Sequence, residues 1–454
     1  MGITRRDLLK GVAVGTVALG CGNSSSEGGA DAALPDANEP DPITPPDGVA
    51  ESAEFPLGVS AGDIGGTHAV LWTRYAGSAP LVAYAWRVEG EAYVEELGPF
   101  PAIPDDGFVH VAIEGLRAGA QYRYTFFEGE RTARSKIGRF RAAIADGATD
   151  VITFGAISCV NKSNNDSAVA RAADHAGLDA FLFLGDNAYC DGADNVAEYR
   201  ALYASHFGRP AHVDLRASTG MYITWDDHEV GNDWNPETID SAKLAAAFQT
   251  FFEHAPCARV ATAPDRIWRS ARWGKTVEVF VLDCRSERKP STRNGATAQY
   301  ISPEQLAWLE QGLAASPCRF KLVMNSVPIT NMPNVWDLYK IDRWEAYAAQ
   351  RTRILKHIDD QQIEGVLWLS GDFHLAFISK VATSGPGSTQ REVLCGPGAQ
   401  GANALLPSLL APQFSFTTGT NNFTTLRFDP ALGEVRIGYI DGDGSEFHTE
   451  AFVI

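Results

Sequence analysis

The chain has 454 residues, of which 45% are hydrophobic and 21% are charged, so it can bury one large core and a smaller second one. Its formal net charge of -18 argues against a nucleic-acid-binding surface, which needs clustered Lys and Arg. A small anionic substrate stays compatible with this charge, because bound cations reverse the local potential of an acidic site.

The first 21 residues have the pattern of an export signal. Arg5 and Arg6 form a twin-arginine pair, and a short apolar run follows at residues 11–20. This run is about half of the roughly 20 residues that cross a bilayer, so we expect a Tat-type signal and export to the periplasm, the membrane surface or the medium. The run ends at Cys21 in the order Leu-Gly-Cys. Lipidation of Cys21, which would be the one membrane attachment, and cleavage by an ordinary signal peptidase are both open.

The next two segments differ sharply in composition. Residues 22–54 are mainly Ser, Gly, Ala, Asp, Glu and Pro, so we expect a disordered linker, with order beginning at Phe55. Over residues 55–146, short β-type runs alternate with Gly and Pro, which predicts a small antiparallel β-sandwich of the fibronectin or immunoglobulin type. The β-type runs are residues 69–74, 81–86, 108–112 and 122–126.

Residues 147–454 are predicted to form an α/β domain. Their apolar runs are continuous, as in strands that are buried on both faces, and a helix near residues 305–309 would cover the sheet. Ligands bind at the carboxyl ends of the strands in such sheets, and here each run ends in a polar cluster. The runs are residues 151–157 before Cys159, 180–184 before Asp186, 221–225 before Asp227, 321–324 before Asn325, and 365–370 before Asp372.

These clusters contain candidate metal ligands. A single Asp after a strand is most often a turn or N-cap residue, so the argument depends on the recurrence. Carboxylate and imidazole groups suit many metals, whereas thiolate and phenolate favour a trivalent or mixed-metal centre. The candidates are Cys159, Asp186, Tyr189, Asp227, Asp372 and His374.

The cysteines allow a second interpretation. Six cysteines follow Cys21, and an even number in an oxidising compartment also fits disulfide bonds. Because the strands that end near Cys159 and Asp186 should be neighbours, a disulfide between Cys159 and Cys190 is an alternative. It would remove one metal ligand.

Several motifs in this order resemble the alkaline phosphatase D (PhoD-like) family of metallophosphatases. The resemblance runs from Phe55 almost to the C-terminus, and it implies a four-layer αββα metallophosphatase domain after the β-sandwich, holding iron(III) and calcium. The motifs are FPLGVSAGD at 55–63, VLWTR at 70–74, GDNAY at 185–189, WDDHE at 225–229, LDCR at 282–285, DRWEAY at 342–347 and GDFH at 371–374.

The resemblance also implies roles. Cys159 and Tyr189 would bind iron and Asp186 would bridge the metals, while Asp227, Asp372 and His374 would complete the cluster. His228 would protonate the leaving oxygen or donate a hydrogen bond to the phosphate. Asn232 would contact a metal or the phosphate. Arg285 is a phosphate contact or, with Asp283, a structural ion pair. Asp226 and Glu229 would orient the ligands.

Two positions depart from the family pattern. Asn187 stands where an aromatic residue is expected, and Asp233 where a second Asn is usual, so the shape or charge of the pocket is expected to differ.

The expected activity is hydrolysis of a small-molecule phosphate ester by a monomer, through in-line attack of a metal-bound hydroxide. One alternative is a phosphodiesterase or phospholipase D-type activity, which the same ligands would support. The other is a catalytically spent surface lipoprotein that binds a glycan or a protein partner.

Overall fold

The computed structural model describes residues 43–454, which form one compact unit. The predicted export signal, Cys21 and most of the predicted linker lie outside these residues. Within residues 43–454, no helix is both long and apolar enough to cross a membrane.

A nine-stranded sheet runs through the centre of the molecule. Its middle strands are β9 (Ile152–Ile157), β10 (Ala180–Leu184) and β11 (Gly220–Thr224), which pair in parallel, and β10 and β11 are buried throughout, as their continuous apolar sequences predict. On one side the sheet continues through β19 (Asn422–Asp429), β20 (Glu434–Asp441) and β21 (Glu446–Val453), and on the other through β1 (Val59–Gly62), β2 (His68–Arg74) and β5 (Phe108–Glu114).

A seven-stranded sheet packs against it. The parallel strands at its centre place their carboxyl ends at one edge, beside those of β9, β10 and β11: the Thr224 hydroxyl donates to the carbonyl oxygen of Leu282 at 2.7 Å. The strand order is β12 (Arg269–Trp273), β13 (Val277–Val281), β14 (Phe320–Met324), β15 (Val366–Ser370), β17 (Arg391–Leu394), β16 (Ala376–Lys380) and β18 (Phe414–Thr418).

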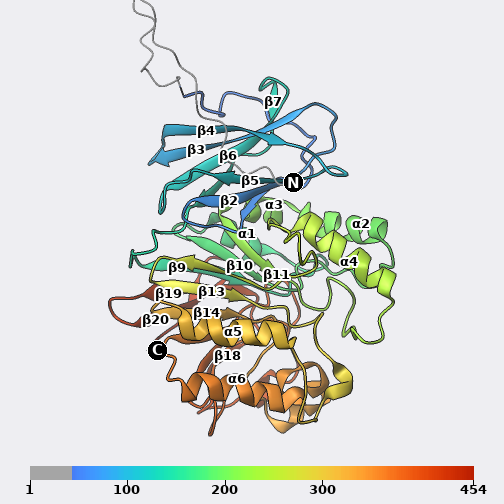
Figure 1. The fold of residues 1–454 in the computed structure, drawn as a ribbon, viewed down its shortest axis with the longest axis vertical. Helices are drawn as coiled ribbons and strands as arrows, with labels where there is room; N and C mark the ends of the chain where they lie inside the picture. The colour runs from blue at the N-terminus through green and yellow to red at the C-terminus, as the bar shows by residue number, and fades with distance from the viewer. Residues whose placement is uncertain (1–42) are drawn as a thin grey trace, which may run out of the picture. The chain divides into compact units, whose positions relative to one another are not determined.

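Helices cover the outer faces of both sheets and complete the four-layer αββα arrangement (Figure 1). The helices α1 (Ser167–Asp174), α2 (Val196–Phe207), α3 (Pro210–Ser218) and α4 (Ser241–His254) pack on the nine-stranded sheet. The helices α5 (Pro303–Ala315) and α6 (Ala348–Asp360) cover the seven-stranded sheet, so the predicted helix near residues 305–309 is confirmed. Short 3₁₀ helices lie in the loops: η1 (Pro290–Thr292), η2 (Asn334–Asp342), η3 (Trp344–Tyr347) and η4 (Leu406–Ser408).

Three helices begin where the sequence supplies a capping side chain. Asn195, Asp240 and Ser302 each accept a hydrogen bond from a backbone N–H in the first turn of the helix that follows. Pro303 occupies the first turn of α5, where its missing N–H costs nothing. These caps fix the lengths of the loops that leave the strand ends.

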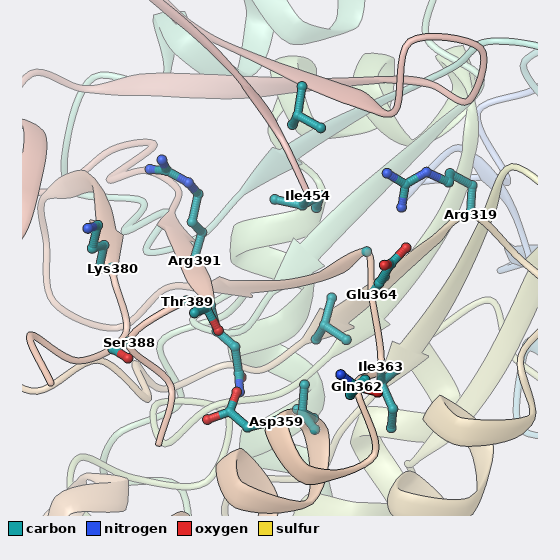
Figure 2. Close-up of a pocket in the computed structure, with 15 residues that line it drawn as sticks. Arg319, Asp359, Gln362, Ile363, Glu364, Lys380, Ser388, Thr389, Arg391 and Ile454 are labelled. Carbon is teal, nitrogen blue, oxygen red and sulfur yellow. The ribbon is translucent and has the colours of Figure 1, made fainter. Parts of the chain in front are cut away.

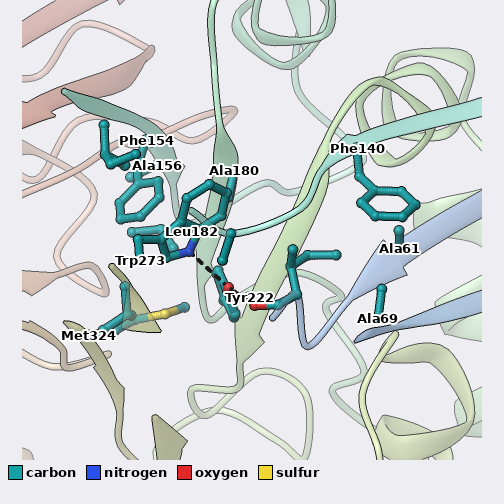
Figure 3. Packing of buried hydrophobic residues seen from close by; sticks show 14 of the residues in the cluster. Ala61, Ala69, Phe140, Phe154, Ala156, Ala180, Leu182, Tyr222, Trp273 and Met324 are labelled. Atoms are coloured by element: carbon teal, nitrogen blue, oxygen red, sulfur yellow. Dashed lines mark hydrogen bonds between the residues drawn. The ribbon is translucent and has the colours of Figure 1, made fainter. Parts of the chain in front are cut away.

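The main core fills the space between the nine-stranded and seven-stranded sheets and continues into the N-terminal strands, as Ala61, Ala69 and Phe140 show (Figure 3). Trp273 of β12 packs edge-on against Phe154 of β9, with ring centroids 5.6 Å apart. Its indole Nε1 donates to the Tyr222 hydroxyl at 3.0 Å, so the buried polar atom is satisfied. This contact joins the two sheets face to face.

The predicted β-sandwich over residues 55–146 is continuous with the nine-stranded sheet. All four predicted β-type runs form strands, but β1, β2 and β5 are hydrogen-bonded into the nine-stranded sheet, where β1 pairs with β11 in parallel. The remaining strands form a five-stranded sheet that packs on β1, β2 and β5. Hydrogen bonds thus cross the predicted boundary at residue 146, since the open edge of β11 takes β1 as its partner. The five strands are β4 (Ala92–Ala102), β3 (Leu81–Glu89), β6 (Gln121–Glu128), β7 (Ala133–Arg134) and β8 (Gly138–Arg141).

The folded part also begins earlier than the predicted Phe55. Pro46 is buried, and residues 50–52 pair with Arg134 of β7. The N–H of Arg134 donates to the carbonyl oxygen of Ala50 at 3.0 Å, and the N–H of Ser52 donates to the carbonyl oxygen of Arg134 at 2.8 Å. The reason is that a polar segment with little apolar surface can still be held by pairing with an open strand edge.

Two buried histidines predict a loss of stability in acid. Burial lowers the pKa of His254 to about 3 and that of His212 well below its usual value. Unfolded histidine takes up a proton near pH 6.5, so this stability is complete above pH 6.5 and is lost as the pH falls toward 3. We expect the two histidines to contribute a loss of up to about 2.7 kcal/mol per pH unit in that window.

Urea unfolding of metal-free protein between pH 7 and pH 4.5 would measure this loss. His212 lies between the rings of Phe183 and Phe207, so His212→Phe preserves the packing and removes one titrating group. The variant should lose stability less steeply, by up to about 1.4 kcal/mol per pH unit. Equal slopes for the variant and the wild type would contradict the prediction.

Candidate metal centre

Polar side chains from both sheets converge where the parallel strands end. Cys159 follows β9, Asp186 follows β10 and Asp227 follows β11, while Asp372 and His374 follow β15 of the facing sheet. The candidates predicted from the sequence therefore lie at one edge of the two-sheet core, as expected for parallel strands.

Three groups of these side chains could each hold a cation. In each group the possible ligand atoms all lie within 4.8 Å of one another, and Asp186 and Asp227 each belong to two groups, so the groups are continuous. The groups are Cys159 with Asp186 and His374, Asp186 with Asp227 and His228, and Asp226 with Asp227 and Asp372.

The cluster carries buried negative charge that the protein does not neutralise. Asp186 Oδ1 and Asp227 Oδ1 are buried without a hydrogen-bond partner among the described residues, although Arg285 Nη2 lies 3.8 Å from the second. Burial and neighbouring carboxylates raise the pKa of Asp186 and Asp372 well above the usual range. Unpaired buried carboxylates are costly unless they coordinate cations, so this donor set fits a metal.

The backbone at four of the candidate ligands is in the left-handed region. The φ angles are 56° at Cys159, 54° at Asp186, 75° at Asp372 and 53° at His374. Residues other than glycine pay on the order of 1 kcal/mol or more for this conformation, which persists where the surroundings impose it and is common at functional sites. The tight turns after the strands thus direct these side chains into the cluster.

Glu229 binds the backbone of the segments that follow β10 and β11. Its carboxylate accepts hydrogen bonds from the backbone N–H groups of Asp186 at 3.2 Å, Asn187 at 2.5 Å and Asp226 at 2.9 Å. Burial raises the pKa of Glu229 to about 7. Glu229 therefore orients the ends of β10 and β11 and does not face the cluster, in agreement with the orienting role expected for it.

Arg285 lies behind the ligands. Its Nε and Nη2 donate to the two carboxylate oxygens of Asp226 at 2.6 and 2.7 Å, and Ser326 donates to the same Asp226 at 2.9 Å. Only 1% of the Arg285 side chain is exposed, and its Nη2 lies 3.5 Å from Asp372 Oδ2. This is the arrangement of a structural ion pair, although with Asp226 rather than with the predicted partner Asp283.

His228 lies at the outer side of the cluster. Its Nδ1 is 2.7 Å from Asp191 Oδ2, and its ring centroid is 4.1 Å from that of Tyr189. Burial lowers the pKa of His228, but the charges of Asp186, Asp191 and Asp227 outweigh it and raise the pKa to about 10. Asp191 was not among the residues predicted from the sequence. Its position two residues after the GDNAY motif was the signal available.

Tyr189 contacts the cluster through its hydroxyl, which donates to Asp186 Oδ2 at 3.3 Å. Burial and the Asp186 charge raise the pKa of this phenol. Gln400, from the loop after β17, donates to the same hydroxyl at 3.3 Å. No pattern in the sequence pointed to Gln400.

The two departures from the family pattern have different positions. Asn187 is buried, and its side chain donates to the carbonyl oxygen of Thr224 at 2.9 Å, so it changes the packing under the turn rather than the pocket. Asp233 is exposed and accepts from Asn232 Nδ2 at 2.8 Å, and its own N–H donates to Asp227 Oδ2 at 2.7 Å. Asn232 itself lies at the surface beside Asp191.

Cys159 and Cys190 are both free and buried, so the alternative disulfide between them is not formed. All six cysteines after Cys21 are free thiols. Cys159 is therefore available as a ligand, and burial raises its pKa well above the usual value in the absence of a cation.

Comparison with known proteins identifies the family. A family model described as PhoD-like phosphatase matches residues 154–405, and one described as its N-terminal domain matches residues 43–144. The chain belongs to the PhoD-like phosphatase family. The matched segments of this PhoD-like chain include the candidate ligands from Cys159 to His374. Whether the N-terminal part is of the fibronectin or immunoglobulin type stays a prediction.

Individual relatives of this PhoD-like chain are distant. It is 26% identical over 387 residues to alkaline phosphatase D of Bacillus subtilis (strain 168), a match that covers 73% of this chain and 66%, just under two thirds, of that protein. A solved structure of PhoD matches with a TM-score of 0.73 at 21% identity, covering 88% of this chain and 89% of that one. A purple acid phosphatase, PPD1 from yellow lupin (Lupinus luteus) seeds, matches with a TM-score of 0.62 at 14% identity, covering 87% and 73%. The two structures support the fold.

A cavity lies away from the edge of the sheets that carries the candidate metal ligands. It has a volume of about 690 Å³ and is lined by the beginnings of β15 and β17, the end of β16 and the loop after α6, with Arg319, Lys380 and Arg391 at its rim (Figure 2). Because the candidate ligands follow the opposite ends of the parallel strands, this cavity is separate from the metal centre.

Proposed function

We propose that this chain is a metal-dependent phosphoesterase. The observation that carries the proposal is Asp186: its carboxylate belongs to two adjoining ligand groups, and one of its oxygens is buried without a partner. Membership of the PhoD-like phosphatase family supports the same activity. Cations at these carboxylates would lower the pKa of a water and neutralise charge on the phosphoryl oxygens during in-line attack.

The proposed ligands are the six candidates from the sequence. Thiolate and phenolate beside carboxylates suit iron(III), and the carboxylate oxygens of Asp227 and Asp372 suit a hard cation such as calcium. The distribution of the ligands between two metals is part of the proposal. The full set is Cys159, Asp186, Tyr189, Asp227, Asp372 and His374.

His228 is the proposed general acid. Asp191 lies 2.7 Å from its Nδ1 and fixes the orientation of the ring, so the other ring nitrogen can present a proton to the leaving oxygen. Asn232 is proposed to contact the substrate. The buried position of Arg285 favours support of Asp226 over contact with the phosphate.

The test is the colour and the activity of purified protein. Tyrosinate or thiolate bound to iron(III) gives a visible charge-transfer band, so we expect coloured protein that loses both the band and the hydrolysis of chromogenic monoesters or diesters on chelation. Comparison of the two ester types decides between monoesterase and diesterase activity. Colourless, iron-free protein that is insensitive to chelators would remove the metal proposal, and a metal-loaded but inactive protein would favour the spent lipoprotein. Export and the monomeric state remain proposals.

A further inference from the structure

A cavity of about 390 Å³ opens directly beside the proposed general acid. Asp191 lines it and holds His228 at 2.7 Å, and Asn232 lines it from the loop that follows the WDDHE motif. A general acid must lie within hydrogen-bond reach of the leaving oxygen. The carbon skeleton attached to that oxygen therefore begins next to His228, and this cavity is beside it.

Several hydrogen-bond donors in the cavity wall are free to bind a ligand. Asp191 already accepts from the backbone N–H of Asn232 at 2.6 Å and contacts His228. Asn235 Oδ1 accepts from the N–H of Glu237 at 2.9 Å, and its Nδ2 makes no hydrogen bond to residues 43–454. In the part of the chain that the structure describes, the Thr238 hydroxyl has no hydrogen-bond partner. The wall therefore suits a group rich in acceptor oxygens.

The rest of the wall provides a cation and apolar surface. Lys243 lines the cavity, and its one ion pair with a residue in the range 43–454 is with the exposed carboxylate of Asp194, at 3.1 Å. Trp234 and Ile239 supply apolar atoms. A volume of about 390 Å³ is within the usual range for small-molecule sites and exceeds what a two-carbon group would fill.

We propose that this cavity binds the alcohol portion of the phosphate ester and selects a ring-sized alcohol with several hydroxyl or ether oxygens, such as a sugar. The proposal rests on the proposed function, because it takes His228 as the acid. Hydroxyl oxygens would accept from Asn235, Thr238 and Lys243, while the C–H face of the ring packs on Trp234 and Ile239.

Two substrates isolate this selectivity. Glucose 6-phosphate and cyclohexylmethyl phosphate have the same phosphoryl group, a primary alcohol as leaving group and a six-membered ring. They differ in the ether oxygen and the hydroxyl groups of that ring, which only glucose 6-phosphate has. Release of phosphate by the metal-loaded full chain gives kcat and KM for each. We expect kcat/KM for glucose 6-phosphate to be at least about tenfold higher, as two or more neutral hydrogen bonds would provide.

Two variants test the wall. Gly231 lines the cavity, its φ is not positive and a Cβ there meets nothing within 4 Å, so Gly231→Val should fill the cavity without strain. Thr238→Val replaces only the hydroxyl, with a methyl group of similar size. We expect Gly231→Val to reduce the preference at least fivefold and Thr238→Val to reduce it about threefold. Gly147→Val is the matched control, since Gly147 is equally unobstructed and its change should leave the preference as it is.

The outcomes separate this proposal from the function on which it rests. Equal hydrolysis of both esters by the wild type overturns the pocket proposal and keeps the phosphoesterase. The pocket proposal also fails if both variants lower kcat/KM by the same factor for the two esters. If the metal-loaded wild type releases phosphate from neither ester nor from chromogenic esters, both proposals fail together. Thermal unfolding of each variant checks that it is folded. If Gly231→Val does not fold, the ratio of kcat/KM values for Thr238→Val tests the pocket proposal by itself.

Discussion

Asp186→Ala is expected to lower kcat/KM for any phosphate ester by at least about 10³-fold, which corresponds to about 4 kcal/mol of transition-state stabilisation. Asp186 belongs to both the group with Cys159 and His374 and the group with Asp227 and His228. Its removal therefore disturbs two adjoining sites at once. Metal content per chain and steady-state kinetics measure the effect.

The same variant should have an unusual effect on stability. In metal-free protein the Asp186 carboxylate is buried beside other carboxylates and one oxygen has no partner, so Asp186→Ala should be at least as stable as the metal-free wild type. The stabilisation that metal gives the wild type should be much smaller in the variant, because binding to the native state is what supplies it.

Asp214→Ala is a suitable control for this pair of effects. It removes the same group from an exposed salt bridge with Lys136, so activity and metal content should not change. An Asp186→Ala variant that keeps full activity would show that the assigned centre is wrong. One that unfolds more readily than the wild type only in the metal-free state would contradict the account of buried, uncompensated charge.

The sequence predicts which candidate ligands lie close together, because the ends of parallel strands leave local signals. Continuous apolar runs identify β9, β10, β11 and β15 as buried parallel strands, and parallel strands must place their carboxyl ends at one edge. Asp186, Asp227 and Asp372 could therefore be grouped before any contact was known. The left-handed backbone at Asp186 and Asp372 carries no comparable signal, because these residues are not glycine.

Contacts between segments that are distant in the sequence could not be predicted from it. The alternation of apolar and polar residues along a strand shows which face of the strand is buried, but not which strand pairs with it. The pairing of β1 with β11 across the predicted domain boundary was therefore not predicted. Asp191 and Gln400 lie in loops and act through single hydrogen bonds to His228 and Tyr189. Asp191 has only its position two residues after the GDNAY motif as a local signal, and Gln400 has none.

Arg285→Ala is expected to destabilise the protein by about 3–5 kcal/mol, the usual result of leaving one charge of a buried ion pair without its partner. Arg285 is 1% exposed and holds both oxygens of Asp226, which is itself fully buried. The free energy of unfolding from urea titration measures the loss. We also expect a lower metal content, since Asp226 and its neighbour Asp227 would no longer be held in place.

Arg353→Ala provides the contrast. Arg353 makes the same two-point contact, here with Glu310 at 2.8 and 2.6 Å, but its side chain is 59% exposed, so the loss should be below about 1 kcal/mol. The comparison also decides between the two roles considered for Arg285. A structural ion pair requires a loss of stability and of metal together. If Arg285→Ala stays stable and metal-loaded but binds inorganic phosphate at least tenfold more weakly, then the guanidinium contacts the phosphate and the ion pair with Asp226 is incidental.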